Sequence, residues 1–455
     1  MNHGASQLWA KGLPLDETVH RFTVGDDPTL DQRLLPFDAL GSAAHARMLA
    51  HTALLMQDDA AALVTQLAAI AAQARRGEVR IRPEQEDCHT AIETLLTQAL
   101  GDAGKRLHLG RSRNDQVALA LRLYMRDALV NIAAQVIELA TAFVNFARTH
   151  AGEVMPGYTH LRRAMPSTFG LWAAAFAAGL AEELQAMQAV YVRLDRCPLG
   201  AAAGFGVPLP LDREYTAKLL GFSSVQVSPV DVMNSRGRHE LALVNELASV
   251  GLVMEKFLWD VVLYSMPEFG FVDLPDAFTT GSSIMPQKRN PDVVELARAR
   301  CRELRGHAAM IQELATGLPS NYHRDVQLLK KPLFAALDIA RDWLDVLIRL
   351  VPALQVNAER AAAACGDELY ATHAAYQHVQ HGVPFRDAYQ RVARQLADGS
   401  FDPDRAALTA THLGGAGNPG LKMIEVQVQD AQQWIERTRK HLGQCEEAIW
   451  SKGQA

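Results

Sequence analysis

Residues 115–148 contain neither proline nor glycine, and this run constrains the fold more than any other feature of the sequence. Apolar residues recur in it at every third or fourth position: Leu121, Met125, Leu129, Ile132, Val136, Leu139, Phe143 and Phe146. That spacing places them on one face of an α-helix and is typical of a left-handed helical bundle. At 1.5 Å per residue the helix would span about 50 Å.

Two later stretches repeat the pattern. The first carries Leu180, Leu184, Met187, Tyr191 and Leu194, and the second carries Leu243, Leu247, Val250, Met254, Phe257, Val261 and Tyr264. Neighbouring positions such as Val244, Leu258 and Val262 are apolar too, so these helices have more than one face to bury. Sustained period-two runs rich in β-branched residues are missing. We predict an all-α chain whose long helices form the core of an oligomer; separate amphipathic helices on a mixed fold are the alternative.

Turn-rich stretches follow each long helix: "MPGYTH", "CPLGAAAGFGVPLPLDRE" and "MPEFGFVDLPDAFTTGSS". After residue 360 the pattern changes to short helices with breaks at "GVPF", "DGSFDPD" and "HLGGAGNPG". We therefore predict three domains: an N-terminal helical domain (1–112), a central long-helix domain (113–360) and a small C-terminal helical domain (361–455).

Charge and hydropathy limit the partners. The net charge is −6 at pH 7, which does not favour nucleic acid or an anionic membrane. The most apolar helical run, residues 241–266, includes four charged residues and so indicates a buried core helix rather than a membrane span. The start, "MNHGASQLWAKG", lacks the apolar stretch of a secretory signal. We expect no nucleic-acid or membrane partner.

The cysteines indicate a reducing compartment. Five are scattered along the chain and form no CxxC pair: Cys88, Cys197, Cys301, Cys365 and Cys445. A disulfide framework or a zinc site is not favoured by this pattern, and we expect free thiols in the cytoplasm.

The stretch "TTGSSIMPQKRNPD", residues 279–292, is polar where the rest of the chain is rich in leucine and alanine. Asn290 followed by Pro291 predicts a helix start, with Asn290 as the N-cap. The loop before it offers Gly281 for unusual backbone angles. Groups that suit an anion, a carboxylate in particular, are Ser282, Ser283 and Lys288. A solvated linker is the alternative.

Two shorter motifs flank the first long helix. "GRSRNDQ", 110–116, has arginines that match carboxylates in a bidentate manner, and we expect Asn114 to cap the helix. A capped helix with exposed arginines and no binding role is the alternative. "PGYTHL", 156–161, contains His160, a candidate general acid or base; a structural histidine is the alternative.

Two more polar clusters remain. "EDCHTAIE", 86–93, brings Asp87 and His89 close in sequence, but a third metal ligand is not evident nearby, and we predict no metal site. "PSNYHRDVQLLKK", 319–331, reads by pattern alone as a polar helix start.

Taken together and in this order, the segments resemble the argininosuccinate lyases of the fumarase/aspartase superfamily. "GSSIMPQKRNPD" is similar to the superfamily signature GSSxMPxKxN, and "GDAGKRLHLGRSRNDQVA" and "MPGYTHLRRAMPS" resemble the two other shared regions. "SAAHARML", "LPDAFTTGSS" and "LPSNYHRDVQ" match as well, so the resemblance covers nearly the whole chain. It implies a three-domain homotetramer with a twenty-helix core, free of metal and organic cofactor. It implies a carbon–nitrogen lyase that splits argininosuccinate into arginine and fumarate.

The resemblance also implies roles for residues, by motif position. The catalytic positions are Ser282, His160, Glu295 and Lys288, with Glu295 as the carboxylate partner of His160. The substrate-binding positions are Asn114, Thr159, Tyr322, Gln327, Lys330, Asn290, Asp31, Asp87, His89, Arg113, Ser112 and Ser283.

The sequence departs from the family pattern at three places. Asp27 stands nearest to the position of a substrate-contacting serine, and Arg162 stands where glutamine is usual. The segment 234–240, "NSRGRHE", differs from the common SDRD type. These differences concern contacts with the substrate rather than the reaction.

The two motifs that flank residues 115–148 would lie about 50 Å apart in a straight helix, too far for one small substrate. The resemblance nevertheless implies that both contribute to one site. Antiparallel packing of subunits would bring them together, which predicts active sites shared between chains. The rival functions are a sister lyase (adenylosuccinate lyase, aspartase or fumarase) and a non-catalytic, crystallin-like structural protein.

Overall fold

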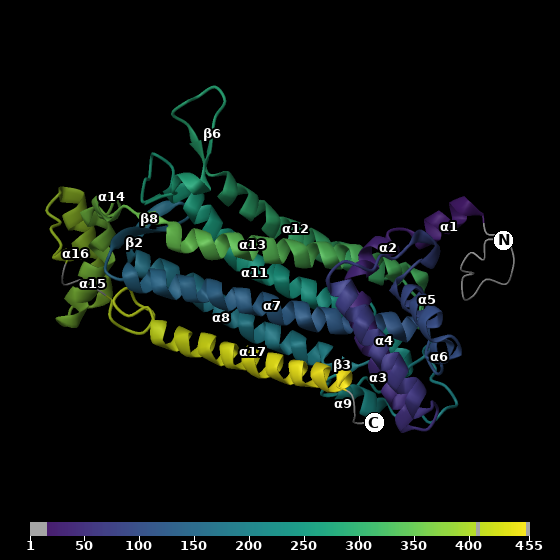
Figure 1. Cartoon of the computed structure of the whole chain (residues 1–455). Coiled ribbons are helices and arrows are strands. Elements are labelled where there is room, and N and C mark those ends of the chain that lie inside the picture. Colours follow the sequence, from purple (N-terminus) through teal and green to yellow (C-terminus); the bar gives the residue numbers. More distant parts are fainter. Residues whose placement is uncertain (1–15, 406–409, 452–455) are drawn as a thin grey trace.

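The computed structural model describes residues 16–405 and 410–451, so the expectation about the first twelve residues falls outside the described part. Long helices lie side by side and form an elongated body (Figure 1). They are α7 (Arg113–Thr149), α8 (Phe169–Leu194), α11 (Arg238–Tyr264), α12 (Asp292–Ala315), α13 (Lys330–Ala353) and α17 (Leu421–Trp450). Helix α7 contacts α8, α13 and α17, and α11 contacts α12 and α8.

Shorter N-terminal elements gather at one end of this body, around the start of α7 (Figure 1). They are α1 (Glu17–Val24), α2 (Asp27–Leu30), η1 (Asp31–Arg33), α3 (Leu35–His51), α4 (Gln57–Arg75), η2 (Pro83–Gln85), α5 (Cys88–Leu100) and α6 (Asp102–Arg106). Between α8 and α11 the chain forms β3 (Arg196–Cys197), α9 (Arg213–Leu219), β4 (Ser224–Val225) and α10 (Pro229–Asn234), with β3 and β4 parallel. The turn η4 (Arg324–Leu329) precedes α13.

The opposite end carries a hairpin and the C-terminal short helices (Figure 1). Strand β1 (Val154–Thr159) pairs antiparallel with β2 (Arg162–Thr168) directly after α7. The remaining elements are β5 (Val272–Asp273), η3 (Asp276–Phe278), β8 (Gln355–Val356), α14 (Ala358–Ala363), η5 (Asp367–Tyr370), α15 (Ala371–Gln380) and α16 (Phe385–Asp398). Strands β5 and β8 pair antiparallel.

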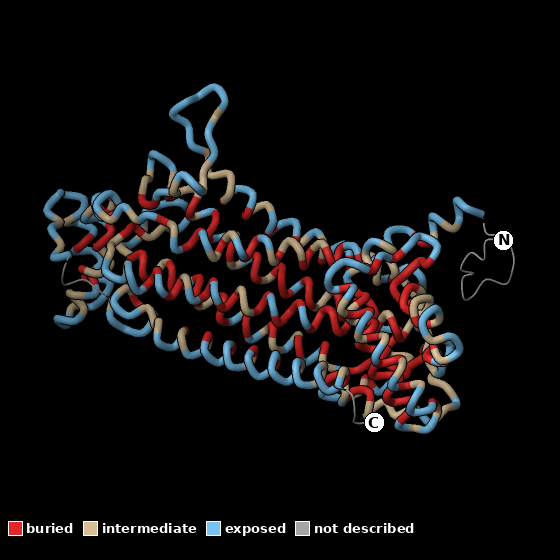
Figure 2. Tube along the Cα trace, viewed as in Figure 1, coloured by how far each residue is buried: buried red, intermediate tan, exposed pale blue. Residues whose placement is uncertain are grey.

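A narrow loop projects from the body before α12 (Figure 1). Its base is the pairing of β6 (Thr280–Gly281) with β7 (Arg289–Asn290), in which Thr280 faces Asn290. Figure 2 shows that most of the projecting loop is exposed, whereas the inner helices are buried along their length.

The predicted long helices are confirmed. Every apolar residue named above for the three helical seams is buried in α7, α8 or α11. All five cysteines are free. Among the described residues, α7 rather than 241–266 is the helix that is long and apolar enough to cross a membrane, and 61% of its most apolar stretch is buried inside the chain. This degree of burial is that of a core helix.

Several local expectations were wrong. The stretch after α7 forms a β-hairpin, because its two strands pair antiparallel across a short turn even though they lack a period-two pattern. Asn290 lies in β7 instead of capping α12, since the pairing with Thr280 keeps it extended; Pro291 takes the N-cap position. Beyond residue 360 the helices are not all short, because α17 has 30 residues and packs along α7 and α8. The division into three domains at 112 and 360 stays a proposal.

Candidate functional site

A cavity of about 320 Å³ lies at the N-terminal end of the body. It is enclosed by the end of α1, the start of α2, the start of α5, the first turns of α7 and the turn η4. Its lining is dense in charge: Asp27, Glu86, Asp87, His89, Arg113, Asn114, Arg236, Tyr322, Arg324, Gln327 and Lys330, with Val24, Val117 and Val326. Seven of the predicted substrate-binding residues are in this set.

The first turn of α7 holds Arg113 and Asn114 at the cavity. Ser112, not Asn114, is the N-cap: its hydroxyl accepts from the Asn114 amide at 3.3 Å. The Asp115 carboxylate accepts from the Ser112 amide at 2.9 Å and completes a capping box. Because serine takes the cap, the side chain of Asn114 is left free of that task and lines the cavity.

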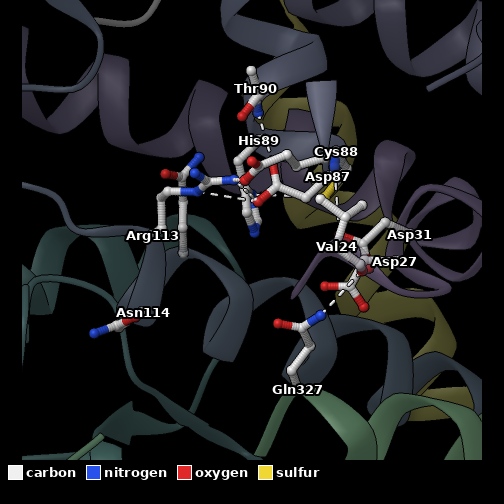
Figure 3. A network of polar contacts seen from close by, with 12 residues as sticks. Val24, Asp27, Asp31, Asp87, Cys88, His89, Thr90, Arg113, Asn114 and Gln327 are labelled. Carbon is white, nitrogen blue, oxygen red and sulfur yellow. Dashed lines mark hydrogen bonds and ion pairs between the residues drawn. The ribbon is translucent and has the colours of Figure 1, made fainter. Parts of the chain in front are cut away.

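Asp87 joins α5 to α7. One carboxylate oxygen caps α5 by accepting from the Thr90 amide at 2.9 Å. The other accepts from Nε and the terminal nitrogen of Arg113, with the Nε contact at 3.1 Å (Figure 3). Burial raises the pKa of Asp87, but nearby His89, Arg113 and the amide hydrogen bond lower it by more. Asp87 is therefore favoured as an anion, and both its carboxylate oxygens are hydrogen-bonded within the protein, to Thr90 and Arg113.

Lys330 is buried between two carboxylates. Its Nζ lies 2.6 Å from Oδ1 of Asp31 and 3.0 Å from Oδ2 of Asp27. Asp31 is fully buried and also accepts from the Cys88 amide at 3.4 Å, so it lies behind the cavity wall. Asp27 lines the cavity itself, and burial raises its pKa to about 6 against the opposing attraction of Lys330.

Tyr322 and Gln327 come from the segment around η4. The Gln327 amide nitrogen donates to the carbonyls of Thr23 and Val24, each at 3.1 Å, and thereby ties the end of α1 over the cavity. Figure 3 shows Gln327 and Asn114 on one side of the space and Asp87 and Asp31 on the other.

Sequence reasoning missed three charged residues of the lining: Glu86, Arg236 and Arg324. Arg236 lies in the segment 234–240, where the departure from the family pattern was noticed without assigning a residue. It is buried and pairs with Glu240 at 3.2 Å. The difference of this segment from the family pattern was the one signal in the sequence that pointed to Arg236.

A metal was considered at Asp31, Cys88 and His89, whose potential ligand atoms lie within 4.8 Å of one another. Lys330 already pairs with Asp31, and Nδ1 of His89 lies 3.0 Å from Oδ2 of Asp38. We therefore assign these groups to the buried ion-pair network.

Thr159 and His160 lie far from the cavity, at the tip of the β1–β2 hairpin. His160 and Leu161 form its two-residue turn and both have positive φ, 53° and 55°. Such turns favour Asn-Gly, and a left-handed residue with a side chain costs roughly 1–2 kcal/mol. Both residues are exposed, and Leu161 retains 76% of its accessible surface. This strained, uncovered tip presents His160 outward.

The predicted residues of the loop 279–292 lie in neither the cavity nor the hairpin, because this loop projects from the body before α12 (Figure 1). The Ser282 hydroxyl accepts from the amides of Ile284 and Met285 at 3.4 and 3.2 Å. Ser283 and Lys288 are exposed, and Asn290 is half-buried in β7. Glu295 is exposed on α12, and an ion pair between it and His160 is not found within the described chain.

One chain therefore gathers only part of the predicted site. The start of α7 and its hairpin are separated by a helix of 37 residues, about 55 Å long. The cavity holds most of the predicted binding groups, while the hairpin, the loop and the start of α12 hold the predicted catalytic groups.

Comparisons with known proteins agree with this architecture. The lyase family model, described as "Lyase", matches residues 16–306. Argininosuccinate lyase of Sorangium cellulosum is 47% identical over 91% of this chain and 96% of its own length. That of Thermotoga neapolitana is 41% identical over 86% of this chain and 98% of its own.

Among solved structures, EDDS lyase in complex with formate superposes with a TM-score of 0.77 at 23% identity, covering 96% of this chain and 95% of that one. A fumarate lyase:delta crystallin from Brucella melitensis gives 0.71 at 20% identity, covering 92% and 97%. These likenesses show that the chain shares the all-α fold of these lyases. The family match and the sequence relatives, which agree with this fold, show that the chain belongs to the argininosuccinate lyase family.

Proposed function

We propose that this chain catalyses the reversible β-elimination of argininosuccinate to L-arginine and fumarate, the last step of arginine biosynthesis. The observation that carries the proposal is the 47% identity to an argininosuccinate lyase over 96% of that protein's length. The four predicted catalytic residues, Ser282, His160, Glu295 and Lys288, are all present in the chain. A structural protein on this scaffold would have no need of them.

The charges of the cavity suit this substrate. Argininosuccinate carries three carboxylates together with guanidinium and ammonium groups. Arg113, Arg236 and Lys330 line the cavity and can receive carboxylates once their protein partners shift. Asp27 lines it as well and is the acid best placed for a cationic group, because Asp31 lies behind the wall.

Ser282 is the proposed base that removes the proton beside a substrate carboxylate. A free hydroxyl is far too weak a base, and each unit by which its pKa is lowered requires about 1.4 kcal/mol. The Ile284 and Met285 amides already point at its oxygen, and Lys288 lies on the same loop. Closure of the loop over substrate would exclude water and strengthen these contacts.

His160 and Glu295 are the proposed pair at the leaving side. His160 would orient or protonate the departing guanidine, and Glu295 would hold its imidazole. Since both side chains are exposed and apart in one chain, the pairing requires either loop movement or a second chain.

The proposed active unit is a homotetramer with sites shared between subunits. Two observations support it: the helix of about 55 Å between Asn114 and the hairpin, and the uncovered tip at His160 and Leu161. Antiparallel packing would bring the start of one α7 beside the end of another. Free cysteines support a cytoplasmic location.

The test is direct. Purified protein is incubated with argininosuccinate, adenylosuccinate, aspartate or malate, and fumarate is followed by its absorbance. Release from argininosuccinate alone supports the proposal. Release from another substrate only would assign a sister lyase, and inactivity toward all four in a folded tetramer would favour a structural role.

A further inference from the structure

His89 presents a buried nitrogen to the cavity. The residue is 6% exposed and is the second residue of α5, after Cys88. Its Nε2 is the only buried side-chain nitrogen or oxygen without a hydrogen-bond partner among the described residues that line the cavity. Figure 3 shows His89 between Arg113 and Asp31, in the middle of the polar network. A buried polar atom left unpaired is costly, which indicates that something else pairs with it.

The cations around His89 are already occupied. Arg113 is paired with Asp87, Lys330 with Asp31 and Asp27, and Arg236 with Glu240. A substrate carboxylate must compete with those protein carboxylates. His89 differs from these three cations in its geometry. The carboxylate that pairs with it lies beside Nδ1, so that Nε2, on the other side of the ring, faces the cavity.

That counter-charge is Asp38 of α3. Its Oδ2 lies 3.0 Å from Nδ1 of His89, and the two side chains are 3% and 5% exposed. Its Oδ1 accepts from the Gln116 amide nitrogen at 3.3 Å, which fixes the carboxylate from α7. Nδ1 also lies 3.7 Å from Sγ of Cys88. Nδ1 therefore has protein neighbours on its side of the ring, and Nε2 is the ring nitrogen without one.

Titratable groups surround the pair on every side. They are Asp31 of η1, Asp87 and Cys88 at the start of α5, His108 in the loop before α7, Arg111 and Arg113 beside it, and Lys330 of α13. Burial lowers the pKa of His89, but Asp38, Asp87 and Asp31 raise it by more, so the net shift is upward. The ion pair with Asp38 thus favours the charged form of the imidazole.

We propose that Asp38 is a positioning residue that holds His89 as a cation with Nε2–H facing the cavity, where this group binds a carboxylate of the substrate. The inference rests on the proposed function. It assigns a carboxylate as the ligand of His89, which was predicted above only as a substrate-binding position, and it assigns Asp38 as the residue that orients it. Asp38 itself acts only through His89, because it has no part in the cavity lining.

The test compares Asp38→Asn with wild type in both directions of the reaction. Asparagine keeps an oxygen for Gln116 and removes the charge that raises the pKa of the buried imidazole, so this pKa should fall. We expect KM for argininosuccinate, and for fumarate or arginine in reverse, to rise about tenfold or more, as loss of a charge-assisted hydrogen bond predicts. The alkaline limb of kcat/KM should move to lower pH, and Asp38→Glu should restore part of it.

Two further variants keep the result decisive. Asp195→Asn breaks another buried ion pair, with Arg126, away from the cavity, and should lower stability without moving the pH profile. His89→Gln keeps a donor without charge and should raise KM and abolish the alkaline limb, even if Asp38→Asn does not fold. Wild-type kinetics in folded His89→Gln or Asp38→Asn would overturn the inference. Failure of the wild type to release fumarate would instead reject the proposed function.

Discussion

Nζ of Lys330 and Oδ1 of Asp31 lie 2.6 Å apart inside the cavity wall, although the residues are 299 positions apart in the chain. The lysine side chain is 4% exposed and the aspartate 0%, so water screens neither charge. The pair fastens the start of α13 to the N-terminal elements and sets the position of the ammonium at the cavity.

Replacing Asp31 by asparagine should therefore lower both stability and activity. Removing one partner of a buried pair leaves an uncompensated charge and costs about 3 kcal/mol, reduced here because Asp27 remains near Lys330. We expect a lower midpoint of chemical unfolding together with a raised KM for argininosuccinate. Asp338→Asn is the matched control, because its pair with Arg33 is exposed and should contribute about 0–1 kcal/mol. Equal effects of the two variants would contradict the assignment.

Asp27→Asn should stabilise the protein while weakening catalysis. The pKa of Asp27 is raised to about 6 by burial, from an ordinary value of 3.8, so the folded state disfavours its charged form. Relative to the unfolded chain, the contribution of this acid is most favourable below about pH 4 and is lost as pH rises through 6. Asparagine removes the penalty above pH 6, by at most about 3 kcal/mol.

Thermal unfolding at pH 5 and pH 8 checks this sign. The gain in Tm of Asp27→Asn over wild type should be larger at pH 8, and kcat/KM should fall at both values. A variant less stable than wild type at pH 8 would show that the contact with Lys330 outweighs the cost of burying Asp27.

Ser282→Ala should abolish turnover and leave substrate binding largely intact, because the hydroxyl is proposed to act on a proton rather than to hold the substrate. Calorimetric titration with argininosuccinate measures binding, and fumarate absorbance measures turnover. Gln287→Ala, on the same exposed loop, serves as the control and should retain activity. Near-normal kcat in Ser282→Ala would remove this serine from the proposed role.

Mixing two inactive variants tests the shared site. Asn114→Ala damages the cavity, and His160→Ala damages the hairpin at the other end of α7. When the two proteins are dissociated and reassociated together, some sites should receive an intact residue from each chain, and part of the activity should return. Confirmed hybrid tetramers of folded subunits that stay inactive would argue that each site is built within one chain.

The long helices were predictable because their signal is local. The buried seam of α7 follows from residues three and four apart, such as Leu121 and Met125, and needs no knowledge of distant partners. The hairpin was missed for the opposite reason: its strands contain Pro156, Gly157 and Pro166, and its order comes from pairing across the turn.

The site divides in the same way. Asn114, Tyr322, Gln327 and Lys330 could be named because they stand in recognisable motifs, and the chain folds them around one cavity. Arg324 and Glu86 stand in the same quoted segments but were not singled out, because spacing along the sequence does not show which side chains of a segment line the cavity. The N-cap of α7 was misassigned because serine and asparagine are comparable caps, and the capping box with Asp115 decides between them.

The unbroken length of α7 has a consequence for how the sequence can change. Inserting or deleting one residue in the middle of the helix would shift its end by about 1.5 Å and turn it by about 100°, carrying the hairpin with it. The β3–α9 connection around Gly206, by contrast, is a surface turn and could absorb such a change locally. Helix α7 thus fixes the separation between the cavity at its start and the hairpin at its end. Amino-acid exchanges along it are tolerable wherever packing allows, but a change in its residue count would move the hairpin relative to the cavity.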